Sequence, residues 1–164
     1  MEEDHAFLRI CNQMARESLQ IGLEPFVAIL VEDGIQKASS RDQSIAYADP
    51  TAHAELVLIS EYCRQEKRIS LEGFTLYSFA EPCVMCSGAI HWAKISRVVF
   101  GVSQASLQRV SGGNPKPSSR EMINIGGKRT EVVGPLLEAE GMEVLTSFPF
   151  LSKKERWRQF RKKK

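Results

Sequence analysis

Two short motifs carry side chains that could bind a metal ion, and each motif contains a proline. "DPTAHAEL" places His53 and Glu55 two residues apart, and "EPCVMC" places Cys83 and Cys86 three residues apart. Cysteines at this spacing share one side of a helix's first turn, where the positive end of the helix dipole favours thiolates. Zinc binds thiolate sulfur and imidazole nitrogen in a tetrahedral arrangement. We therefore predict a zinc site formed by His53, Cys83 and Cys86.

This zinc site is predicted to have three protein ligands. Cys63 lies ten residues beyond His53, about 15 Å along the same helix, and His91 lies eight residues beyond Cys83, about 12 Å along its own helix. Neither can complete the tetrahedron. Three ligands leave one position open, which is typical of catalytic zinc. Glu55 is placed to act as the base that takes a proton from the activated water and carries it to a leaving amine.

Each motif alone has an ordinary explanation. A histidine and a glutamate two apart occur by chance at helix starts, and a lone Cys-x-x-Cys pair is also found at redox sites. The combination of His-x-Glu with a later Pro-Cys-x-x-Cys is the signature of the zinc deaminases that act on nucleobases. The combination therefore favours catalytic zinc over a redox pair.

The segments around the motifs predict helices that alternate with short apolar strands. Apolar periodicity and the positions of proline and glycine define each segment. The expected elements are a helix over 4–21, a hairpin around Asp33-Gly34, a helix from Asp49 and Pro50 to about Glu66, a strand over 74–79, a helix from Pro82 to about Lys94, a strand over 96–101, a strand over 129–134 and a helix over 135–145. This order predicts an α/β fold, with a sheet covered by helices.

The composition is that of an ordinary globular protein. The 164 residues are 43% hydrophobic and 26% charged, which suits one domain with a substantial core. No apolar run is long enough to span a bilayer, and the acidic start "MEEDHAF" lacks the features of a signal peptide. We expect a cytoplasmic location and no membrane partner. In that compartment the four cysteines favour a metal or catalytic role over disulfides.

At this point the chain resembles the cytidine deaminase superfamily, in the branch of guanine deaminases and tRNA adenosine deaminases. The matching segments are "DPTAHAE", "TLYSFAEPCVMCSGAI" and "RVVFG", and the resemblance extends over about residues 22–103. It implies a cytidine deaminase-like three-layer α/β/α fold with a five-stranded mixed sheet, and a homodimer. It also implies that zinc-bound hydroxide attacks a ring carbon while Glu55 shuttles protons and ammonia leaves. On this resemblance, residues 1–164 form a single zinc-dependent deaminase domain with a basic tail over 152–164.

The motifs leave the substrate open between two classes. "PFVAILV" with Phe26 and "GAIHWA" with Trp92 resemble the guanine deaminases, whereas "EPCVMC" and "RVVFG" are closer to the tRNA enzymes. We favour a deaminase of a nucleobase or nucleoside, of guanine-type purine specificity. The alternative is a tRNA-specific adenosine deaminase that converts adenosine to inosine. A third hypothesis, a non-catalytic zinc-stabilised RNA-binding module, requires a missing proton shuttle or a fourth ligand.

Candidate substrate-binding residues are Asp42, Phe26, Ala54 and Trp92. Both groups of relatives carry an asparagine at the position of Asp42, eleven residues before the zinc histidine, where it hydrogen-bonds the substrate. An ionised aspartate only accepts hydrogen bonds, so Asp42 would select a substrate N–H or hydroxyl and repel a bare acceptor. Phe26 and Trp92 could stack on a ring, although aromatic residues in apolar segments more often belong to the core.

The C-terminal tail has two interpretations. Residues 153–164 hold eight lysines and arginines against one glutamate, and include Trp157 and Phe160. Such a tail could bind the RNA backbone and stack on a base, which would make tRNA a partner. It could equally be a helix that docks its aromatic residues on the core and leaves its charges in solvent.

Overall fold

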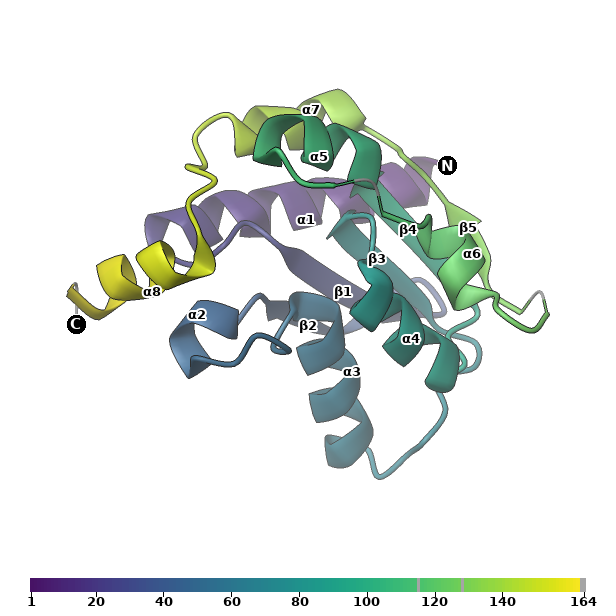
Figure 1. The fold of residues 1–164 in the computed structure, drawn as a ribbon. Helices are drawn as coiled ribbons and strands as arrows, with labels where there is room; N and C mark the ends of the chain where they lie inside the picture. The colour runs from purple at the N-terminus through teal and green to yellow at the C-terminus, as the bar shows by residue number, and fades with distance from the viewer. Residues whose placement is uncertain (115, 128, 163–164) are drawn as a thin grey trace.

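A five-stranded mixed sheet lies at the centre of the structure (Figure 1). The computed structural model describes residues 1–114, 116–127 and 129–162. The strands are β1 (Val27–Glu32), β2 (Ile35–Arg41), β3 (Thr75–Ala80), β4 (Arg97–Val102) and β5 (Glu131–Val133). Their order is β2-β1-β3-β4-β5. β1 is antiparallel to both of its neighbours, whereas β3, β4 and β5 are parallel to one another.

Helices cover both faces of this sheet. The described part of the chain contains α1 (Glu2–Gln20), α2 (Ser44–Tyr47), α3 (Ala54–Gln65), α4 (Val84–Trp92), α5 (Gln104–Ser111), α6 (Ser119–Ile123), α7 (Glu138–Leu145) and α8 (Lys153–Lys162). In Figure 1, α1 and α7 lie on one side of the sheet, and α3 and α4 lie on the other. The predicted three-layer α/β/α fold with a five-stranded mixed sheet is confirmed.

Each face of the sheet has its own apolar core. Leu76 and Val98 belong to the core under α3 and α4, whereas their chain neighbours Tyr77 and Val99 belong to the core under α1 and α7. Side chains alternate between the two faces of a strand, so a strand covered by helices on both faces is apolar at almost every position. This burial explains why "TLYSF" and "RVVFG" read as continuous apolar runs.

The hairpin between β1 and β2 forms where the sequence predicts it. Asp33 and Gly34 both have positive φ, at 52° and 71°, as a two-residue turn of this hand requires. Gly34 adopts this conformation without strain because it lacks a Cβ atom. The turn brings the end of β2, and the loop that follows it, back beside the start of β1.

The predicted start of α3 is wrong. α3 begins at Ala54 with His53 as its N-cap, and Asp49 and Pro50 precede it in a turn. The Asp49 carboxylate accepts hydrogen bonds from the backbone N–H and the hydroxyl of Thr51, at 2.8 and 2.7 Å, so it stabilises this turn and not the helix. The start of α4 is likewise two residues later than predicted, with Cys83 as its N-cap.

The C-terminal half contains elements that the sequence pattern did not predict. The short helices α2, α5 and α6 lie in segments for which the sequence pattern predicted no helix or strand. The basic tail forms α8, which lies beside α2 at the edge of the molecule (Figure 1). None of the helices in the described ranges is long and apolar enough to cross a membrane.

Candidate metal centre and reaction pocket

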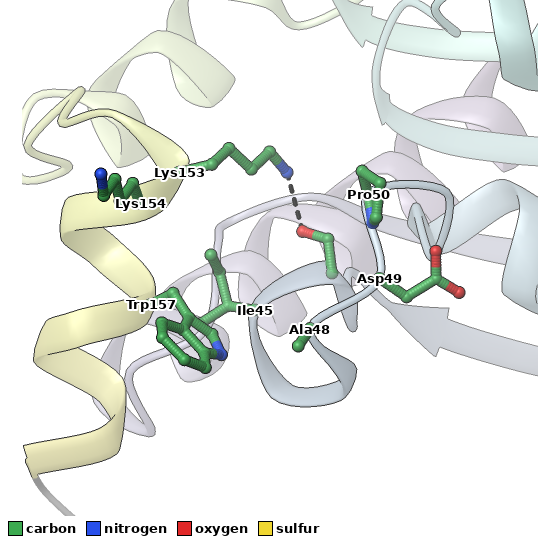
Figure 2. Close-up of a pocket in the computed structure, with 8 residues that line it drawn as sticks. Ile45, Ala48, Asp49, Pro50, Lys153, Lys154 and Trp157 are labelled. Carbon is green, nitrogen blue, oxygen red and sulfur yellow. Dashed lines mark hydrogen bonds between the residues drawn. The ribbon is translucent and has the colours of Figure 1, made fainter.

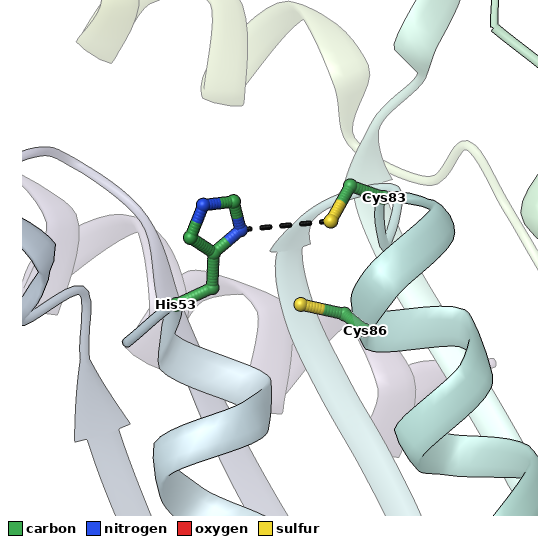
Figure 3. A group of neighbouring side chains, drawn as sticks. All are labelled: His53, Cys83 and Cys86. Atoms are coloured by element: carbon green, nitrogen blue, oxygen red, sulfur yellow. Dashed lines mark hydrogen bonds between the residues drawn. The ribbon is translucent and has the colours of Figure 1, made fainter. Parts of the chain in front are cut away.

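The three predicted zinc ligands lie together where α3 and α4 begin (Figure 3). His53 and Cys83 are the N-cap residues of these two helices, and both have extended backbone conformations. The two helix starts therefore point at the same place, which brings an imidazole and two thiols into one cluster. His53 and Glu55 are two residues apart, about 200° around a helix, so both can face the metal only if the helix approaches the metal with its N-terminal end.

The geometry of the cluster fits a zinc ion. Nδ1 of His53 lies 3.5 Å from Sγ of Cys83, and the ligand atoms of His53, Cys83 and Cys86 all lie within 4.8 Å of one another. In a tetrahedral site the ligand atoms stand about 3.5–3.8 Å apart, given the usual Zn–S and Zn–N distances. Small side-chain adjustments would satisfy this geometry. Within the described residues, no fourth histidine, cysteine or carboxylate joins the group.

The surroundings of the two thiols favour metal binding. The hydrogen bond from Cys86 and the neighbouring His53 lower the pKa of Cys83 to about 3, against the opposing effect of burial. The same contact raises the pKa of Cys86, because only one of two adjacent thiols readily loses its proton. One thiolate is therefore formed in advance, and a cation is needed to displace the second proton.

Glu55 is buried beside the cluster, in the first turn of α3. Its side chain accepts a hydrogen bond of 2.9 Å from the hydroxyl of Ser78, and the residue is 8% exposed. Ser78 also donates to the backbone carbonyl of Ala80 at 2.7 Å, so its hydroxyl proton is shared between two acceptors. Burial raises the pKa of Glu55 above its ordinary value. A carboxyl with a raised pKa is suited to both accepting and donating a proton near neutral pH.

A cavity of about 160 Å³ opens next to the metal cluster. Among the predicted site residues, those that line it are Phe26, Asp42, His53, Glu55 and Cys83. Cys86 is fully buried behind its partner ligands. The structure thus brings the predicted metal cluster, the predicted base and two of the predicted substrate-binding residues together around one pocket.

Asp42 is held in this pocket by its own loop. Its backbone N–H donates to the carbonyl of Phe26, at 2.9 Å, just beyond the last β1–β2 pair. Its carboxylate oxygen Oδ1 accepts hydrogen bonds from the backbone N–H of Ser44, at 2.9 Å, and from the Ser44 hydroxyl, at 2.5 Å. Asp42 is only 2% exposed, so its carboxylate has a defined position at the pocket wall.

Two predicted substrate-binding residues do not reach the pocket. Trp92 lies at the far end of α4 and is 82% exposed, beside Ile59 and Cys63 on another part of the surface. It cannot contact a ring held at this metal centre in the same chain, because α4 runs away from the metal. The side chain of Ala54 packs in the core under α3 and is not a lining group.

Several residues that line the pocket were not predicted as site residues from the sequence. The lining also includes Glu24, Ala80, Glu81, Gln104, Leu107, Lys116 and Lys153. Glu81 has a local signal, since it directly precedes the Pro-Cys motif, but its carboxylate accepts hydrogen bonds from Gln104 and Ser119 and so anchors α5 and α6. Glu24 and Lys153 have no local signal, because they meet only in the folded chain.

The sequence also matches a known protein family. Residues 1–102 match the model of the cytidine and deoxycytidylate deaminase zinc-binding region. The match covers the metal cluster and the proposed base. The chain belongs to this family.

Relatives with different substrates resemble the chain to similar degrees. A probable cytosine deaminase of Schizosaccharomyces pombe is 33% identical over 146 residues, covering 86% of this chain and 89% of the relative. The guanine deaminase of Bacillus subtilis is 31% identical over 159 residues, covering 96% of each. A structure from a study of A-to-I editing by tRNA:A34 deaminases has a TM-score of 0.67 and 28% identity, covering 86% of this chain and 99% of that one.

The family and the geometry together establish the type of chemistry. The chain is a zinc-dependent hydrolytic deaminase. These proteins are named as a probable cytosine deaminase, a guanine deaminase and tRNA:A34 deaminases, so the family alone does not select the substrate.

Proposed function

We propose that this protein deaminates a free nucleobase of the guanine type, with His53, Cys83 and Cys86 as zinc ligands and Glu55 as the proton shuttle. The overall reaction replaces the ring amino group by a carbonyl oxygen from water and releases ammonia. Zinc at this site supplies a nucleophile at neutral pH, because it lowers the pKa of water. Asp42 and Phe26 line the cavity in which the ring would lie.

Glu55 performs the proton transfers in this proposal. Its carboxylate takes a proton from the attacking water and donates it to the amino group that leaves as ammonia. Ser78 fixes the position of the carboxylate through its 2.9 Å hydrogen bond. Burial keeps bulk water from competing for the proton, and the raised pKa of Glu55 makes its return to the leaving group easier.

The size of the reaction pocket carries the preference for a free base. Its volume of about 160 Å³ is below the roughly 300 Å³ at the lower end of drug-sized sites, so it suits a single small ring system. Lys153 of α8 also forms part of its lining. The likeness to the Bacillus subtilis guanine deaminase over nearly the whole chain supports the same choice.

Ammonia release from a substrate panel tests the proposal. The zinc-loaded protein is incubated with guanine, adenine, cytosine and the corresponding nucleosides. We expect turnover of guanine, with xanthine as the product. Turnover of another member of the panel, with guanine untouched, would reject the substrate but leave the deaminase chemistry in place.

A second candidate is the deamination of adenosine in tRNA. Several cations of α8, among them Lys154, Arg158 and Arg161, belong to its exposed face, and Trp157 is half-buried beside them. A basic face with an aromatic residue could hold an RNA backbone. Inosine formed in an anticodon stem-loop, with no activity on free bases, would favour this candidate over the first.

We also propose that the protein forms a homodimer and that it is not a non-catalytic module. Trp92 and Ile69 are 82% and 94% exposed, and such large apolar side chains on one surface would be covered by a second copy. Sedimentation of the full chain tests this dimer. The module hypothesis requires a missing proton shuttle, and Glu55 is buried beside the metal cluster, as a shuttle should be.

A further inference from the structure

Part of the lining of the reaction pocket comes from three segments that lie far apart in the chain. Glu24 precedes β1, Asp42 follows β2, and Lys153 is the first residue of α8. All three line the pocket. Given the deaminase function, the arrangement of these three residues bears on which base the pocket selects.

Lys153 connects the other two through hydrogen bonds. Its ammonium group donates to Oε2 of Glu24 at 3.1 Å and to the hydroxyl oxygen of Ser44 at 2.7 Å. Figure 2 shows the second contact as a dashed line, with Lys153 extending from the start of α8 towards the start of α2. Because the hydroxyl of Ser44 accepts from Lys153, its proton is directed at Asp42.

Ser44 therefore relays the position of α8 to Asp42. Two hydrogen bonds from Ser44 occupy Oδ1 of Asp42. Among the described residues, the other carboxylate oxygen has no hydrogen-bond donor, and Asp42 lines the cavity.

Apart from Glu55, the proposed proton shuttle, the other carboxylates that line the pocket already have protein partners. Glu24 lies against two cations, Lys153 and Arg156, whose atoms are 3.1 and 3.2 Å from its oxygens. Arg156 is itself buried and stacks over Phe148 at 4.2 Å, which fixes α8 against the body of the protein. The carboxylate of Glu81 accepts hydrogen bonds from Gln104 of α5 and Ser119 of α6. The pocket thus offers the free oxygen of Asp42 as its acceptor for the substrate.

We propose that Lys153 and Ser44 are positioning residues that hold Asp42 as a hydrogen-bond acceptor, so that the first turn of α8 helps to select substrates with a ring N–H beside the amino-bearing carbon. Guanine carries such an N–H. Adenine and cytosine carry an unprotonated ring nitrogen there, which cannot donate a hydrogen bond to an acceptor oxygen. This assigns an inward-facing role to part of the basic tail, separate from any contact with RNA.

The test compares binding and turnover in matched variants of the full, zinc-loaded chain. The variants are Asp42→Asn, Ser44→Ala, Lys153→Met, Lys153→Arg and, as the control, Lys154→Met. Lys154 is the neighbouring cation on the same helix, does not line the reaction pocket and is exposed. Initial rates are measured with guanine, adenine and cytosine. Dissociation constants for the same three bases are measured in a Glu55→Gln background, in which a bound base is expected to persist.

We expect Asp42→Asn to lower the affinity for guanine, relative to the affinities for adenine and cytosine, by about tenfold or more. The reason is that an amide can also donate a hydrogen bond to an unprotonated ring nitrogen. Lys153→Met and Ser44→Ala should each give a smaller shift in the same direction, about two- to tenfold, in KM and not in kcat. Lys153→Arg should restore most of the loss, and Lys154→Met should match the parent. Zinc content should be equal in all variants.

Two results would overturn the inference. One is an unchanged ratio of guanine to adenine affinity in Asp42→Asn. The other is an equal change of the guanine-to-adenine affinity ratio in Lys153→Met and Lys154→Met, in chains whose zinc content and melting temperature match the parent. If the parent deaminates a different base, the proposed substrate is rejected, but the direction of the ratio change in the Glu55→Gln background still decides the role of Asp42.

Discussion

The two sides of the reaction pocket are held in different ways. The metal side consists of His53, Cys83 and Cys86 at the starts of α3 and α4, which are packed on the same core. The selecting side consists of Asp42 and its supports Ser44 and Lys153, and it depends on one exposed lysine side chain from the end of the sequence.

This difference has a physical consequence. Helix starts buried on a shared core place ligand atoms with little freedom, so the chemistry of the metal side resists changes elsewhere in the protein. Contacts of an exposed lysine are weakened by water and salt, so the selecting side can change at small cost in stability. We therefore expect changes on the metal side to abolish the reaction, and changes on the selecting side to alter which substrate is used.

Removing a metal ligand should have the largest effect. Cys86→Ser should lose both zinc and all measurable deaminase activity, because a serine hydroxyl is a poor zinc ligand at neutral pH. Zinc content by atomic absorption and ammonia release check this. The control is Cys63→Ser, on the last turns of α3 and outside the metal cluster. A Cys86→Ser chain that keeps zinc would show that another residue completes the site.

Replacing the base should separate metal binding from chemistry. Glu55→Gln should lower kcat about 10²- to 10⁴-fold while zinc stays bound, because proton transfer is lost but the ligands are intact. The matched control is Glu61→Gln, an exposed glutamate on the same helix. Unchanged activity of Glu55→Gln would remove Glu55 from the mechanism.

A buried ion pair away from the pocket should affect stability alone. Asp4 accepts hydrogen bonds from Arg97, at 2.6 and 3.0 Å, and from the hydroxyl of Tyr77, at 2.9 Å. Arg97 lowers the pKa of Asp4 from 3.8 to about 2. The pair therefore stabilises the fold above pH 3.8, and this contribution is lost as the pH falls towards 2.

Asp4→Asn should lower the free energy of unfolding at pH 7 by about 2 kcal/mol, and the difference from the parent should shrink between pH 4 and pH 2. Urea unfolding monitored by circular dichroism measures it. The control is Glu2→Gln, an exposed residue of the same first turn. A change in the relative use of guanine and adenine by Asp4→Asn would contradict the separation between stability and selection.

Neutralising the outward-facing cations of α8 should have the smallest effect. Lys154→Gln combined with Arg158→Gln removes two exposed charges and leaves Lys153 and Arg156 in place. We expect less than a twofold change in kcat/KM for a free base, since neither residue lines the reaction pocket. A large loss confined to an anticodon stem-loop substrate would favour the tRNA function.

Local spacing explains why the metal side could be predicted from the sequence. Each motif is local, with His53 and Glu55 two residues apart in one and Cys83 and Cys86 three residues apart in the other. The signature that combines the two motifs predicted that they meet, although thirty residues separate His53 from Cys83. The strand positions also followed from apolar runs. The exact helix starts did not, because Asp49 forms a turn with Thr51 in place of a helix cap. Trp92 was proposed on the resemblance alone. It lies nine residues beyond Cys83 on α4, so the helical rise that excluded His91 also carries Trp92 away from the metal.

The amino-acid sequence by itself predicted the family, the zinc-binding cluster and the layered sheet through its two motifs and its apolar periodicity, and it singled out Glu55 as the proposed base. Tertiary structure alone decided what surrounds Asp42. Lys153 reaches Glu24 across 129 positions and Ser44 across 109 positions of the chain. No local pattern specifies contacts of such separation, because they arise only when the packing of Arg156 on Phe148 seats α8 beside α2. The same basic residues that suggested RNA binding thus include Lys153, which lines the reaction pocket and donates hydrogen bonds to Glu24 and Ser44.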